Sequence, residues 1–214
     1  MSLMAKPLPS ARPQTCPEPS CAAPLELPYL CGTCGELLRP PPGLNHFERF
    51  GIAPSMDLDL EALEARYLEL SRKLHPDRVL GKSAATQARA LALSSALNEA
   101  YQTLRDPRRR AEHLLAVHGG KSAEQDRRAP DGLLLEMMER HEEVDAARAA
   151  GDGERLAAIE REASAEEDAA LDRARSLFAD PAFPTPDLLD AVRLELNAAN
   201  YWNTLQALAR GEHG

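Results

Sequence analysis

Hydrophobic residues recur every three or four positions in several segments of the chain after residue 57. In the first such segment, residues 57–74, the apolar positions alternate steps of three and four, at Leu60, Leu63, Tyr67, Leu70 and Leu74. This spacing places them in one stripe along an α-helix and predicts an amphipathic helix. We expect the helix to end at His75, because Pro76 pushes the residue before it out of the helical region.

A second helical pattern begins at Ser83, whose side chain can cap a helix, and extends to about residue 104. Its apolar face consists of Leu93, Leu97, Ala100 and Leu104. The Asp-Pro pair at 106–107 predicts the start of a shorter helix, which should end at the glycine pair 119–120. Together with a short lead-in (HFERFGI), these elements predict one domain over residues 43–120, built on an antiparallel helical hairpin.

Three further helical patterns follow a polar linker at residues 121–130, and they cover about 131–149, 154–178 and 187–209. Short connections and one apolar face on each helix predict an antiparallel three-helix bundle as the domain over residues 121–214. The fold class is therefore expected to be all-α. The composition agrees, because aromatic residues make up only 4% of the chain and Ala, Leu, Glu and Arg are abundant.

The first 42 residues differ from the rest because they are rich in proline and contain all four cysteines. Cys16 and Cys21 are separated by four residues, and Cys31 and Cys34 by two. Cysteine pairs of this spacing, followed by a turn glycine, are typical of a metal site, and four thiolates suit one Zn(II) per chain. We predict a zinc module over residues 1–42 that shares little core with the helices, because the prolines favour an extended linker.

Other interpretations of the cysteines remain open at this stage. Rubredoxin-type iron also binds to such pairs, and ligation of an iron–sulfur cluster is conceivable, which would make the chain a redox or electron-transfer protein. Free or disulfide-bonded cysteines are a further alternative. Reduced thiols in a metal site favour a reducing compartment, so we expect the protein in the cytoplasm.

The net charge and hydropathy exclude several classes of function. A formal net charge of −9 disfavours general nucleic-acid binding, which needs a basic face. The sequence contains no apolar run approaching the roughly 18 residues of a membrane span, so we expect no membrane partner. The first 15 residues also lack the apolar stretch of a secretory signal.

The tripeptide His75-Pro76-Asp77 lies in the turn between the first two long helices. The exposed side of the preceding helix carries three basic residues, Arg66, Arg72 and Lys73. A catalytic interpretation would take His75 as a base that Asp77 orients. Three residues of this composition are also a common turn, so the tripeptide by itself indicates little and the enzymatic interpretation is the weaker one.

The order of these features resembles the J domain of DnaJ-type co-chaperones, through HFERFGIAP, LEARYLELSRKLHPDRV and ALNEAYQTLRDPRRRAEHLL. The resemblance implies that the basic face and the His-Pro-Asp loop bind a DnaK-type chaperone and stimulate its ATPase. Hydrolysis then belongs to the partner, and this chain is not an enzyme. Clustered cations on an otherwise acidic chain suit this role, since they can orient it on an acidic partner surface.

The C-terminal half narrows the resemblance to HscB, the co-chaperone of iron–sulfur cluster assembly. The matching stretches are RAEHLLAVHG, LLLEMMERHEEVDAARAAGD and the last helix with Tyr201-Trp202, so the resemblance spans about residues 45–210. It implies that the bundle binds an IscU-type cluster scaffold and delivers it to an HscA-type chaperone. A general J-domain protein that delivers unfolded clients to DnaK is the alternative function.

The first bundle helix has apolar residues on two nearly opposite sides. At about 100° per residue, Leu133, Met137 and Val144 fall on one side, which we predict to be core. The other side carries apolar and acidic residues, Leu134, Leu135, Met138, Glu139 and Glu142. An apolar patch with an acidic rim is typical of a partner site, and the resemblance implies that Tyr201 joins it. Alternatively, both sides are buried, or the patch contacts the J domain.

Overall fold

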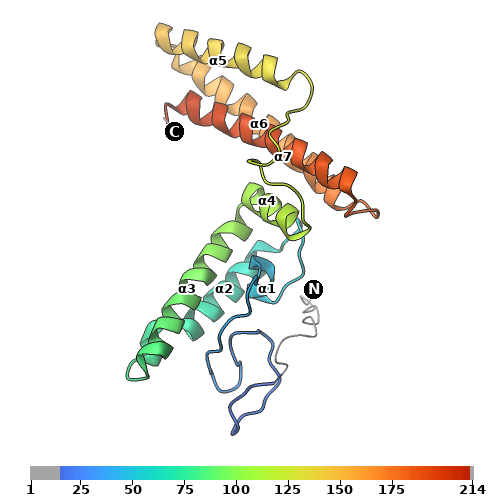
Figure 1. The fold of residues 1–214 in the computed structure, drawn as a ribbon. Helices are drawn as coiled ribbons and strands as arrows, with labels where there is room; N and C mark the ends of the chain where they lie inside the picture. The colour runs from blue at the N-terminus through green and yellow to red at the C-terminus, as the bar shows by residue number, and fades with distance from the viewer. Residues whose placement is uncertain (1–14, 213–214) are drawn as a thin grey trace. The chain divides into compact units, whose positions relative to one another are not determined.

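The computed structural model describes residues 15–212, in which the regular secondary structure consists of α-helices and one 3-10 helix (Figure 1). Contacts divide the chain between Asp106 and Pro107 into two compact units, which we call unit 1 and unit 2. The all-α fold class is confirmed. Within the described range, no helix is both long enough and apolar enough to cross a membrane.

The helices of unit 1 form the predicted hairpin. They are α1 (His46–Phe50), α2 (Leu60–Leu74), the 3-10 helix η1 (Pro76–Val79) and α3 (Ala84–Arg105). In Figure 1, α2 and α3 lie side by side, and η1 belongs to the turn that joins them. The Asp59 side chain accepts a hydrogen bond from the backbone N–H of Ala62, and Ser83 caps α3 in the same way.

Helix α2 begins at Leu60, three residues later than the sequence pattern predicts, because Asp59 caps it. Leu60 is therefore in the first turn, where its side chain is 48% exposed rather than part of the core. Tyr67 is half-buried and stacks on Tyr101 of α3, with ring centroids 4.2 Å apart. The other predicted members of the stripe are buried, and these are Leu63, Leu70 and Leu74.

The cysteine-bearing segment belongs to the core of unit 1, so the expectation of little shared core is wrong. The Tyr29 hydroxyl donates to the carbonyl of Arg49 in α1, and Arg89 Nη1 of α3 donates to the carbonyl of Leu37 at 2.6 Å. The buried apolar side chains of the segment include Leu25, Leu27, Tyr29, Leu30 and Leu37. The first 14 residues of the predicted module lie outside the described range.

Unit 2 contains α4 (Pro107–Val117), α5 (Leu133–Ala150), α6 (Gly153–Phe178) and α7 (Pro186–Arg210). Helices α6 and α7 form the longest pair, and α5 contacts both. Asp152 caps α6 and Thr185 caps α7 through side-chain oxygens. The three-helix bundle predicted from the sequence is therefore present, with ends that differ from the predicted ones by a few residues.

Helix α4 groups with the bundle, although the sequence pattern assigned it to the domain ending at residue 120. The reason is an ion pair inside unit 2. Arg193 of α7 is fully buried, and its guanidinium donates to both carboxylate oxygens of Glu112 in α4, at 2.6 and 2.7 Å. A buried guanidinium is costly without its carboxylate, so this bidentate pair fixes α4 against α7.

Candidate metal centre and docking surfaces

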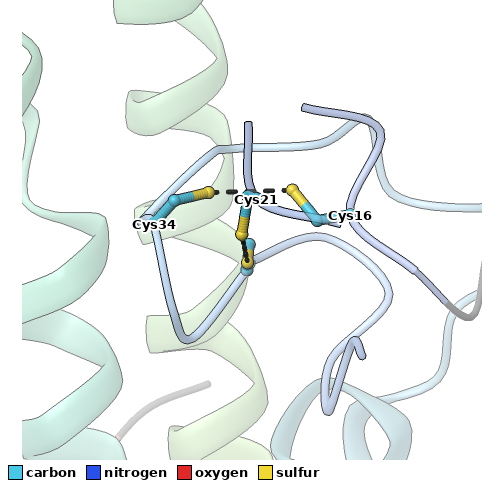
Figure 2. Close-up of side chains that lie close together, drawn as sticks. Cys16, Cys21 and Cys34 are labelled. Carbon is cyan, nitrogen blue, oxygen red and sulfur yellow. Dashed lines mark hydrogen bonds between the residues drawn. The ribbon is translucent and has the colours of Figure 1, made fainter. Parts of the chain in front are cut away.

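The four cysteines come together in one site, as the sequence predicts. The Sγ atoms of Cys16 and Cys34 are 3.7 Å apart, as are those of Cys21 and Cys31. All four sulfur atoms lie within 4.8 Å of one another. In Figure 2, the side chains of Cys16, Cys21 and Cys34 converge from different parts of the segment.

Two tight turns create this convergence, and each contains cysteines of one pair. The backbone N–H of Cys21 donates to the carbonyl of Glu18 at 2.9 Å, and that of Gly35 donates to the carbonyl of Cys31 at 2.9 Å. Each turn ends in a residue of left-handed backbone conformation, Gly35 with φ +75° and Ala22 with φ +46°. Glycine adopts this conformation freely, whereas alanine does so at a cost of roughly 1–2 kcal/mol.

The donor set fits one tetrahedral ion. Metal–sulfur bonds of about 2.3 Å imply sulfur–sulfur separations of about 3.8 Å, close to the two 3.7 Å pairs. A cluster with two or more irons would bind thiolates on different irons and spread them further apart. The geometry therefore favours a mononuclear site over the iron–sulfur alternative.

The thiols differ in how easily they lose their protons. Backbone N–H groups of Cys34 and Thr33 donate to the Cys31 sulfur and lower the pKa of this thiol to about 6, against the effect of burial. The N–H of Glu18 favours the thiolate of Cys16, but burial and the other three thiols outweigh it and raise the pKa of Cys16 to about 12. A bound metal cation would therefore favour the thiolate of Cys16, which the raised pKa disfavours at neutral pH.

The His-Pro-Asp loop is exposed directly after α2. His75 and Asp77 have side chains that are 56% and 75% exposed, and Pro76 opens η1. His75 Nδ1 accepts from the backbone N–H of Asp77 at 3.3 Å, which orients the ring across the turn. The loop therefore contributes little to the core and presents both polar side chains to solvent.

Two residues of the predicted basic face are joined by a carboxylate that the sequence analysis missed. Glu69 accepts from Arg66 Nη1 at 2.7 Å and from Lys73 Nζ at 2.5 Å. These partners, Lys73 first and then Arg66, hold the pKa of Glu69 below its usual range. The third predicted residue, Arg72, is exposed. The i,i+3 and i,i+4 spacings along α2 are a signal that could have revealed this arrangement.

The two sides of α5 are as the helical wheel predicts. Leu133, Met137 and Val144 are buried. On the other side, which we call the α5 patch, three apolar side chains are exposed by 55%, 63% and 64%, and they are Leu134, Leu135 and Met138. The alternative in which both sides are buried is therefore wrong. Glu139 and Glu142 are exposed on the same helix, and Tyr201 is half-buried on α7.

Arg140 of α5 forms ion pairs with two carboxylates. Its Nη1 atom lies 3.2 Å from Glu143 and 2.8 Å from Glu162 on α6. The residue lines an open cavity of about 280 Å³ whose apolar lining includes Ile159 and Trp202. None of the three α5 patch residues lines this cavity, so the two features are separate.

Comparisons with known proteins agree with both halves of this description. The chain matches the DnaJ domain over residues 45–113 and the HSCB C-terminal oligomerisation domain over residues 129–209. Co-chaperone protein HscB of Proteus mirabilis (strain HI4320) is 36% identical over 116 residues, which cover 54% of this chain and 67% of that protein.

Two solved structures share the fold. The crystal structure of human co-chaperone protein HscB aligns with a TM-score of 0.75 at 24% identity, covering 90% of this chain and 96% of the human chain. Chaperone HscB from Vibrio cholerae aligns with a TM-score of 0.65 at 27% identity, covering 78% and 96%. The two family matches, the Proteus mirabilis relative and the shared fold all agree. The chain therefore belongs to the HscB family of J-domain co-chaperones.

Proposed function

We propose that this protein binds an IscU-type iron–sulfur scaffold through the α5 patch and delivers it to a DnaK-type, HscA-like chaperone whose ATPase it stimulates. The observation that carries the proposal is the exposure of three large apolar side chains on a helix whose opposite side already fills the bundle core. A well-packed bundle has no need of these side chains, whereas a partner that covers them gains their burial.

The proposed chaperone contact lies at the end of the α2–α3 hairpin. His75 and Asp77 are exposed on a loop that Pro76 restricts, so they can be presented to a partner at little entropic cost. Arg66, Arg72 and Lys73 would add attraction to an acidic surface. This chain then supplies binding and orientation, and the partner supplies the hydrolysis.

The proposed scaffold contact is apolar at its centre and acidic at its edge. Leu134, Leu135 and Met138 would act as the anchors, while Glu139 and Glu142 would guide association with a basic rim on the scaffold. Tyr201 is proposed to extend this surface from α7. The alternative of a general J-domain protein predicts weak binding to many unfolded chains rather than strong binding to one folded partner.

The metal centre is proposed to hold one Zn(II) through Cys16, Cys21, Cys31 and Cys34. Zinc bound there would supply a cross-link between the two turns, which a segment of this size needs in order to fold. Since the site requires reduced thiols, a cytoplasmic location is part of the proposal.

A binding experiment with a matched control tests the scaffold contact. Titration calorimetry would compare the wild type with L134A/L135A/M138A and with L60A/L68A/L91A, which removes three exposed leucines from unit 1. We expect scaffold affinity to fall more than about tenfold in the first variant only. Equal affinity in all three proteins would contradict the proposal.

The description of the matched family model as an oligomerisation domain raises a second use for the same patch. Sedimentation of the wild type and of L134A/L135A/M138A would separate the two. If the wild type self-associates and the variant loses only this property, while scaffold affinity is unchanged, the patch is an interface between copies of this chain.

A further inference from the structure

A single carboxylate lies between two cations of the proposed docking face. Arg66, Glu69 and Lys73 follow one another along α2 at spacings of three and four residues, so they form one row on the helix. The row ends two residues before His75. Arg66 also has its Nη2 atom 3.9 Å from Glu26 of the cysteine-bearing segment, so it lies between two carboxylates.

Charge alone does not account for an acidic residue at this position. A face that attracts an acidic partner loses attraction when a carboxylate cancels one of its positive charges. On that reasoning, Glu69 weakens docking, and its removal should strengthen it. An acidic residue in the middle of the row therefore needs a different physical reason.

Geometry supplies such a reason. Long Arg and Lys side chains lose rotamer freedom when they bind a partner, and this loss opposes binding. Both side chains here are already held by one carboxylate, at 2.7 and 2.5 Å, in the free protein. Side chains that are ordered before the encounter lose less freedom during it, which favours the complex.

We propose that Glu69 is a positioning residue of the docking face, which holds Arg66 and Lys73 in the arrangement that contacts the chaperone. The inference rests on the proposed function of the α2 face. It assigns to Glu69 a favourable effect on docking, opposite in sign to the effect of its charge.

Glu69→Gln and Glu64→Gln test whether Glu69 strengthens or weakens docking. Both variants remove one negative charge from α2, and Glu64 is exposed on the same helix but outside the row. The readout is the concentration of this protein that half-saturates stimulation of a DnaK-type chaperone's ATPase, at low and at physiological salt. We expect E69Q to raise that concentration roughly three- to tenfold, and E64Q to change it less than about twofold.

The inference would be overturned if E69Q half-saturated ATPase stimulation at the same concentration as E64Q or at a lower one. Glu69 would then affect docking only through its negative charge. Glu69→Asp keeps the carboxylate and should fall between the wild type and E69Q. An E69D variant no better than E69Q would also count against positioning. Helical content and melting temperature of each variant, measured by circular dichroism, exclude a loss of folding as the cause.

The failure of the inference is distinguishable from the failure of the proposed function. If the wild type stimulates the chaperone and His75→Gln does not, the docking role stands whatever E69Q does. If the wild type itself gives no stimulation, the proposed function fails first and the role of Glu69 falls with it.

Discussion

Unit 1 draws its buried side chains from loops as well as helices, while the core of unit 2 comes mainly from four helices. In unit 1, Tyr29 and Leu37 of the cysteine-bearing segment are as deeply buried as Leu63 of α2. In unit 2, α6 and α7 pair over most of their length, and the buried Arg193 joins α4 to them. Irregular backbone needs a cross-link to hold it in place, whereas paired helices stabilise one another.

The candidate docking surfaces of the two units also differ, because that of unit 1 is polar and that of unit 2 has an apolar centre. Unit 1 exposes a loop and a row of ion-paired side chains on α2, where contacts are polar and directional. Unit 2 exposes three apolar side chains on α5. Polar contacts govern orientation and rates of association, while buried apolar anchors supply affinity. If the two surfaces bind the proposed partners, we expect a weaker, more rapidly exchanging contact in unit 1 and a stronger one in unit 2.

The largest expected effect is a complete loss of ATPase stimulation from a single substitution in the His-Pro-Asp loop. His75→Gln or Asp77→Asn should abolish stimulation of a DnaK-type ATPase, because the loop presents both side chains to solvent. Scaffold affinity, which the proposed function assigns to unit 2, should not change. A coupled ATPase assay and titration calorimetry on the same preparations would show this. Normal stimulation by both variants would contradict the proposed docking role of this loop.

A pair of variants on α5 contrasts its two sides. Met137→Ala removes a buried side chain and should lower the free energy of unfolding by about 2–5 kcal/mol. The L134A/L135A/M138A variant removes three exposed side chains and should change it by less than about 1 kcal/mol. Urea unfolding followed by circular dichroism measures both. If the triple variant is destabilised as strongly as M137A, the patch belongs to a core rather than to a surface.

Removal of zinc should affect unit 1 and leave unit 2 unchanged. Metal analysis should find one zinc per chain, and chelation should lower the melting temperature of unit 1 by about 10 °C, since a loss of about 2 kcal/mol has this effect in a domain of this size. Hydrogen exchange should rise in residues 15–42 and in α1, because Tyr29 hydrogen-bonds to Arg49. Exchange confined to the turns around the cysteines would show that the shared core holds without the metal.

Acid should produce the smallest effect, and it should act on unit 2. Arg128 holds the pKa of Asp126 below its usual range through side-chain hydrogen bonds. A carboxyl group with a lowered pKa in the folded state contributes stability that is complete above its ordinary pKa of 3.8 and is lost as the pH falls through the lowered value. Unit 2 should therefore lose stability below about pH 4, and Asp126→Asn should reduce that dependence in thermal melts. An unchanged profile in D126N would assign the acid sensitivity to other groups.

Local patterns in the sequence determined most of the secondary structure and much of the site. The helices, the break at His75-Pro76 and the division of α5 into buried and exposed sides all follow from the spacing of residues within one segment. The spacing of the cysteines likewise predicted that they would form one cluster. A helix repeats every 3.6 residues whatever surrounds it, so its faces can be predicted before its neighbours are known.

Tertiary structure alone decided which segments share a core. Arg89 reaches the carbonyl of Leu37 across 52 positions of sequence, and Arg193 reaches Glu112 across 81. These contacts group the cysteine-bearing segment with unit 1 and α4 with unit 2, whereas the DnaJ domain match continues into α4, to residue 113, as the sequence pattern had assigned it. Such pairs leave no periodic signal within either segment, because each forms only when the rest of the fold brings the two groups together.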